Sequence, residues 1–148
     1  MEAAMTKIAL FKRIVRTPKR SYTFTVEVHE TADRDSRLLP ESFYSTGDPP
    51  TIPEGRHHEM ELIEAPAYGR VNPEVAIHVY TLPGTEKHFV CWTMPLATVE
   101  AARELFDWWC LGTVYSLEHE RDFAHLLDEH ADDMPEFLKQ KHGIEFDT

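Results

Sequence analysis

The sequence predicts a single α+β domain, 1–148, in which an antiparallel sheet of four to five strands carries a C-terminal layer of two to three helices. Residues 1–95 contain short runs that alternate apolar and polar side chains, as strands do. Residues 96–143 instead repeat apolar side chains at helical spacing. Strands in one part of a chain and helices in the other are typical of α+β folds, and 148 residues suffice for one core.

The first half is expected to hold two N-terminal strands and a long loop. Residues 21–29 alternate strictly and predict a half-buried strand. Residues 6–16 fit either a helical apolar stripe or a strand followed by a turn, and we favour the strand. Residues 30–55 are rich in Pro, Asp, Ser and Gly and predict an irregular loop, whereas 57–65 predict another strand.

The clearest local pattern is a hairpin within 74–94. Two apolar, β-branched and aromatic runs flank Pro83 and Gly84, which favour a turn. In the expected pairing, Val79 and Val90 share one face and Phe89 lies on the other. Because both faces are apolar, we expect this hairpin to lie centrally in the sheet, covered on both sides.

The last third predicts three helices. Thr98 is a suitable N-cap for a first helix that ends near Gly112. Ser116 can cap a second helix that runs to about His130. Asp133 and Gly143 are suitable start and stop residues for a third.

Charge excludes some classes of function. The formal net charge of −11 argues against direct binding of nucleic acid, because neutralising phosphates needs Lys and Arg. The charge is uneven: residues 1–20 hold six basic side chains, whereas 100–136 hold eleven acidic ones and only two Arg. No apolar run could span a bilayer, and two cysteines without a disulfide pattern suggest a reducing, cytoplasmic location.

The acidic C-terminal segment is the candidate binding surface. Carboxylates late in a helix oppose its dipole, and few Lys or Arg stand four residues away to compensate, so stability alone does not explain them. Two aromatic residues on a second apolar stripe could add anchors, although they could equally belong to the core. The candidate partner-binding residues are Glu118, Asp122, Glu129, Asp132, Asp133, Trp108 and Tyr115.

An enzyme is the competing interpretation. His57, His78 with Cys91, or Asp122, His125 and Glu129 could supply a small hydrolase or a metal site. The chain contains no P-loop, no H-E-x-x-H and no G-x-S-x-G, and it marks no complete ligand set. We therefore assign no catalytic residue, metal or cofactor.

The expected function is that of a small acidic binding protein. Such a protein would dock its helical face on a basic partner, for example a nuclease or another nucleic-acid-binding protein, and block the partner's nucleic-acid or substrate site. Immunity proteins and anti-defence proteins provide analogies for this mode of action. Self-association through the second apolar stripe, giving a homodimer, is a further alternative.

Overall fold

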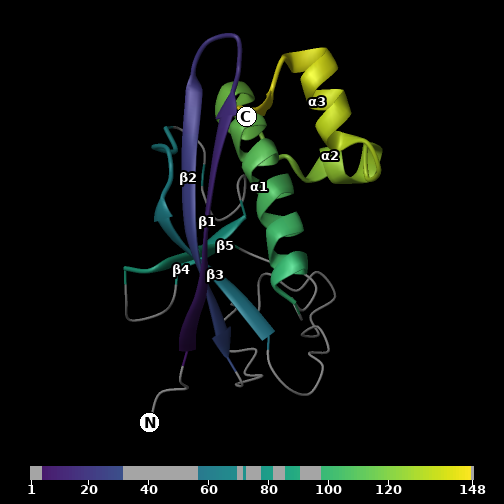
Figure 1. Cartoon of the computed structure of the whole chain (residues 1–148). Coiled ribbons are helices and arrows are strands. Elements are labelled where there is room, and N and C mark those ends of the chain that lie inside the picture. The colour runs from purple at the N-terminus through teal and green to yellow at the C-terminus, as the bar shows by residue number, and fades with distance from the viewer. Residues whose placement is uncertain are drawn as a thin grey trace.

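The structure is a computed structural model that describes residues 5–31, 57–69, 72, 78–81, 86–90 and 98–147. These residues form an antiparallel sheet with helices packed on one side, which confirms the predicted α+β class (Figure 1). The sheet has six strands. In spatial order they are β4 (Val79–Thr81), β5 (His88–Val90), β3 (His57–Glu64), β2 (Ser21–Thr31), β1 (Met5–Arg16) and β6 (Glu145–Phe146).

Strands β1 and β2 form the longest hairpin. Residues 6–16 are extended, as we favoured, and the register pairs Phe11 with Val26 and Val15 with Tyr22. The turn is closed at Thr17, whose backbone N–H donates to the carbonyl of Arg20 at 2.8 Å. Phe11, Val15, Phe24 and Val26 are buried on the helix-facing side.

The hairpin of β4 and β5 exists, but it lies at one end of the described strand order and not at its centre. The predicted distribution of its side chains over the two sheet faces is confirmed. Val79 pairs with Val90 and both are buried, while Phe89 is buried on the opposite face. Apolar residues on both faces indicated burial on both faces. Such burial does not require a central position, since the end of a sheet can also be covered.

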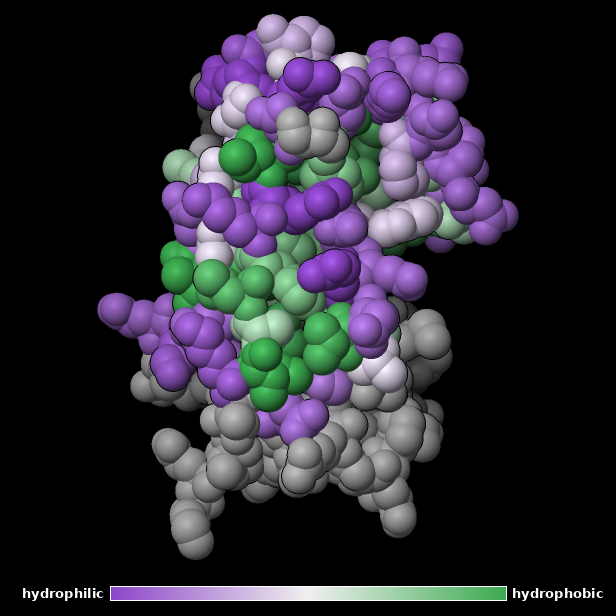
Figure 2. All heavy atoms as spheres, in the orientation of Figure 1, coloured by the Kyte–Doolittle hydropathy of each residue, from purple (hydrophilic) through white to green (hydrophobic). Residues whose placement is uncertain are grey.

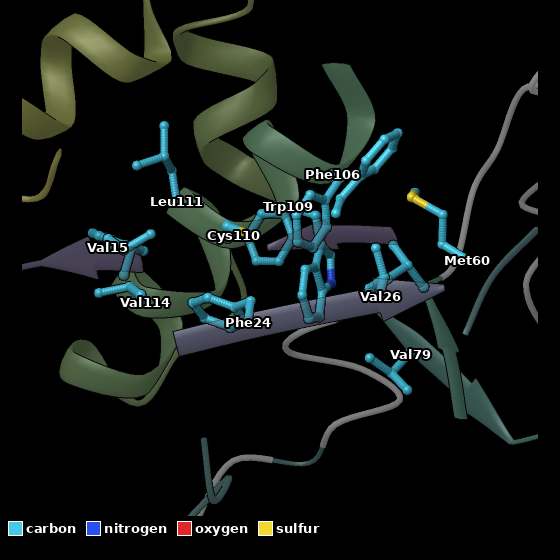
Figure 3. Close-up of a cluster of buried hydrophobic side chains, with 14 of the residues drawn as sticks. Val15, Phe24, Val26, Met60, Val79, Phe106, Trp109, Cys110, Leu111 and Val114 are labelled. Atoms are coloured by element: carbon cyan, nitrogen blue, oxygen red, sulfur yellow. The ribbon is translucent and has the colours of Figure 1, made fainter. Parts of the chain in front are cut away.

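Helix α1 (Val99–His119) crosses the sheet and forms most of the other half of the core. Thr98 is its N-cap as predicted, and its hydroxyl accepts a hydrogen bond from the N–H of Ala101 at 3.0 Å. Figure 3 shows Phe106, Trp109 and Cys110 of α1 above Phe24 and Val26 of β2. The rings of Phe24 and Trp109 meet edge to face, with centroids 5.4 Å apart.

The predicted end of this helix near Gly112 was wrong, and so was the new start at Ser116. Residues 111–116 are buried between the sheet and the later helices, and this packing outweighs the weak helix propensity of glycine. A Cβ on Gly112 would lie 2.5 Å from the ring of Phe123, so the glycine permits a close approach. The helix ends instead at Glu120, which is left-handed with φ 52°.

Two short helices follow, beside the C-terminal half of α1 (Figure 1). Helix α2 (Ala124–Glu129) has six residues, and α3 (Met134–His142) has nine. Asp133 is at the N-cap position of α3 and Gly143 at its C-cap, with φ 65°, as predicted. Within the described part of the chain, no helix is both long enough and apolar enough to cross a bilayer.

Candidate functional site

An acidic surface covers the outer side of α2, the following turn and the start of α3. We use this name for Leu127, Asp128, Glu129, Asp132, Asp133 and Glu136, all of which are exposed. Figure 2 shows hydrophilic side chains over this part of the molecule. The sequence contains no Lys or Arg from 122 to 138, so this segment supplies no permanent positive charge to the surface.

Most of these carboxylates have no partner among the residues that the structure describes. Asp133 lies 3.1 Å from Nδ1 of His130, whose ring stacks on Phe137 with centroids 3.8 Å apart. The side chains of Asp128, Glu129, Asp132 and Glu136 form neither a hydrogen bond nor a salt bridge within the described ranges. They are therefore available to an external cation.

Helix stability explains only part of this surface. Glu136 lies in the first turn of α3, where the helix dipole favours a negative charge. Asp128 and Glu129 end α2, where the same dipole is unfavourable by about 0.3 to 1 kcal/mol per charge. Beside them the apolar side chain of Leu127 is 41% exposed. Folding alone does not account for this combination of charge and exposed apolar surface.

Glu118 does not belong to the acidic surface. Its Oε2 accepts hydrogen bonds from the hydroxyls of Thr17 and Tyr22, both at 3.0 Å. Glu118 thereby ties α1 to the β1–β2 hairpin. Burial and this hydrogen bond raise the pKa of Tyr22 to about 12.

Asp122 is also used internally. Its Oδ1 lies 2.9 Å from Nε2 of His78 and accepts a hydrogen bond from the N–H of Ala124 at 2.6 Å. The backbone carbonyl of Asp122 accepts from Nδ1 of His125 at 2.9 Å. Because a carbonyl cannot donate, this contact places a proton on Nδ1 of His125. Asp122 therefore organises the turn between α1 and α2.

The two predicted aromatic anchors are not free on the surface. Tyr115 is buried, at 5% exposure, and its ring contacts the rings of His119, His125 and His142 with centroid distances of 4.6 to 5.6 Å. Trp108 is half-buried and packs against the core. Both residues agree with the alternative interpretation, in which the second apolar stripe belongs to the core. The reason is that α1 is sandwiched between the sheet and the later helices.

The predicted enzyme sites are not assembled in the described residues. Asp122, His125 and Glu129 do not share a helix face, because α1 ends before Asp122 and α2 begins after it. His78 faces Asp122, while Cys91 and the side chain of His57 lie outside the described residues. The remaining cysteine, Cys110, is a buried free thiol whose pKa is raised well above its usual range by burial.

One cluster of possible metal ligands was not expected from the sequence. On the sheet face away from α1, Glu27, His29 and Glu61 bring their ligand atoms within 4.8 Å of one another. Antiparallel pairing produces this arrangement, since Glu27 lies directly opposite Glu61. Strand alternation could have suggested it, but the pairing of 21–29 with 57–65 was not predicted.

These three residues could hold a divalent metal, yet the protein supplies its own cations there. Nζ of Lys7 lies 3.2 Å from Glu27, and Nε2 of His29 lies 3.5 Å from Glu27 and 3.2 Å from Glu61. Like charges directly opposite in a sheet repel, and the ammonium group of Lys7 offsets that repulsion, while Nε2 of His29 lies within reach of both carboxylates. The cluster is therefore explained as an ion-pair network.

Comparison with known proteins finds no matching family model, no similar curated protein and no similar solved structure.

Proposed function

We propose that this chain is a cytoplasmic, non-catalytic binding protein that docks its acidic surface on a basic protein and blocks that protein's nucleic-acid or substrate site. One observation carries the proposal. Asp128, Glu129, Asp132 and Glu136 are exposed, have no partner among the described residues, and share a short stretch of the chain with the exposed Leu127. The free thiol of Cys110 suits a reducing compartment.

The arrangement suits recognition of a cationic cleft. Carboxylates accelerate encounter with a basic surface, and an exposed apolar side chain such as Leu127 adds binding energy when the interface excludes water around it. Side chains of Lys and Arg that normally contact phosphates could instead contact Asp128, Glu129, Asp132 and Glu136. Nucleic acid and this protein would then compete for one site.

The revised surface is smaller than the one expected from the sequence. Glu129, Asp132 and Asp133 remain in it, while Asp128, Glu136 and Leu127 are added. Glu118, Asp122 and Tyr115 act as internal supports, because their polar groups already have partners. Trp108 packs against the core and is not part of the docking face.

A competition experiment tests the proposal. The chain is used as bait in cells that encode it, and the retained basic protein is purified and bound to labelled DNA or RNA. Wild-type chain should displace the nucleic acid. A variant with Asp128→Asn, Glu129→Gln, Asp132→Asn and Glu136→Gln should need at least a tenfold higher concentration.

The matched control removes four other exposed carboxylates, with Glu86→Gln, Glu100→Gln, Glu104→Gln and Asp147→Asn. Its net charge equals that of the first variant, so it separates the position of the charge from its amount. Loss of displacement in both variants to the same extent would overturn the proposal. So would a ternary complex in which the nucleic acid stays bound.

A further inference from the structure

Among the residues that the structure describes, the outer edge of β1 is unpaired over most of its length. Strand β6 pairs only with Val15 and Arg16, and no other described strand lies beyond β1. With respect to the described strands, residues 5–13 therefore present an open edge, which faces the viewer in Figure 1. Proteins usually protect such an edge, because its free backbone groups can pair with another chain.

The direction of the free backbone groups follows from β6. The carbonyl of Ile14 accepts a hydrogen bond from the N–H of Asp147 at 2.8 Å, so the polar backbone groups of Ile14 point outward. Strands repeat every two residues, so those of Lys12 and Leu10 point outward as well. These groups can serve as the partners of an added strand.

Apolar side chains accompany this edge. Ile8 is 39% exposed and Leu10 is 55% exposed. Figure 2 shows apolar side chains gathered on the face over β1. An exposed apolar patch beside an unpaired edge is typical of a protein-binding site.

A groove of about 270 Å³ runs between this edge and α1. Its lining includes three cations, Lys12, Arg13 and Arg103, and one carboxylate, Asp107. Asp107 lies 3.2 Å from Nε of Arg13, and Arg103 lies over the ring of Phe11 at 5.1 Å. Lys12 and Arg103 form no salt bridge in the described part of the chain. The groove is thus locally basic in a chain of net charge −11.

We propose that the edge of β1 binds an extended segment of a partner protein by strand addition, and that this segment alternates acidic and apolar residues. Its backbone pairs with the outward groups of Leu10 and Lys12. Its apolar side chains lie over Leu10 on the sheet face away from α1, and its carboxylates lie on the face toward α1, where they contact Arg103. Strand addition supplies affinity through the backbone, while the alternate side chains supply specificity.

This interface is independent of the acidic surface, which has the opposite charge and lies on other elements. The two can therefore be tested separately.

Labelled ten-residue peptides provide the probe, one alternating Glu with Val and the other alternating Lys with Val. Fluorescence anisotropy should show at least tenfold tighter binding of the Glu peptide. Hydrogen exchange should slow at the amides of Leu10 and Lys12 when that peptide is bound. Equal binding of the two peptides would overturn the proposal.

Leu10→Pro removes an outward N–H while sparing the pairing with β2, and proline is tolerated at strand edges. It should weaken binding of the Glu peptide at least tenfold. Leu10→Ala keeps the N–H and should weaken it less. If the two substitutions have the same effect, backbone pairing is not the mode of binding.

A charge variant keeps the test valid if Leu10→Pro does not fold. Arg103→Glu should remove the preference between the peptides, whereas Lys141→Glu, an exposed site elsewhere, should not. An unchanged preference in the first variant contradicts the proposal. A dimer detected by light scattering also contradicts the proposal if Leu10→Pro abolishes it. The edge of β1 would then pair with a second copy of the chain and not with a partner protein.

Discussion

The carboxylate of Glu118 on α1 accepts a hydrogen bond at 3.0 Å from the hydroxyl of Tyr22 on β2. Thr17, at the start of the β1–β2 turn, donates to the same oxygen. A residue that the sequence suggested as a docking group is thus a link between helix and sheet.

Glu118→Gln should destabilise the fold by about 1 to 3 kcal/mol, because hydrogen bonds to a charged group are stronger than those to a neutral amide. Glu129→Gln, at an exposed site without a partner in the described part of the chain, should change the free energy of unfolding by less than about 0.5 kcal/mol. Urea denaturation of both variants measures the difference. Equal effects would contradict the role given to Glu118.

The pKa of Tyr22 gives a second prediction. Because it is raised from 10.0 to about 12, the neutral phenol is favoured in the folded state. This contribution to stability should be fully present below pH 10 and should be lost as the pH rises toward 12. Denaturation at a series of alkaline pH values should show this loss in the wild type and a smaller one in Tyr22→Phe. The same slope in both proteins would refute the assignment.

Gly112→Ala should destabilise the protein although alanine favours helices. The new methyl group would lie 2.5 Å from the ring of Phe123, and overpacking of this kind costs about 1 to 3 kcal/mol. The gain in helix propensity is only about 1 kcal/mol. A lower melting temperature is expected in Gly112→Ala, and adding Phe123→Leu should recover part of it. A more stable Gly112→Ala protein would show that the contact is not tight.

His78 and Asp122 should be coupled, since their side chains lie 2.9 Å apart. Each is about one third exposed, so a double-mutant cycle with His78→Ala and Asp122→Asn should give a coupling energy of about 0.5 to 1 kcal/mol. Additive effects would show that the pair does not hold the α1–α2 turn.

Local sequence patterns predicted the features that depend on neighbouring residues. The alternation of 21–29, the cap at Thr98 and the stop at Gly143 depend on neighbouring residues alone, and the structure confirms them. The continuation of α1 past Gly112 and Ser116 could not be predicted from neighbouring residues. Both residues are buried by contacts with distant segments, and those contacts outweigh local preference.

For the candidate site, too, the local features could be predicted from the sequence and the long-range contacts could not. The absence of Lys and Arg from 122 to 138 is visible in the sequence, and no described Lys or Arg forms a salt bridge with Glu129, Asp132 or Asp133. The partners of Glu118 lie about a hundred residues earlier in the chain, and Asp122 contacts His78 across 44 residues. No helical spacing could reveal contacts of that range, so these two carboxylates were assigned to the wrong environment.

The rate of association with the captured basic protein tests the central claim most directly. Stopped-flow measurements at increasing salt should show fast, salt-sensitive association for the wild type and the Glu86, Glu100, Glu104 and Asp147 control. The variant neutralised at Asp128, Glu129, Asp132 and Glu136 should associate at least tenfold more slowly at low salt, with a weaker salt dependence. Equal rates and equal salt dependence in all three proteins would contradict docking through the acidic surface.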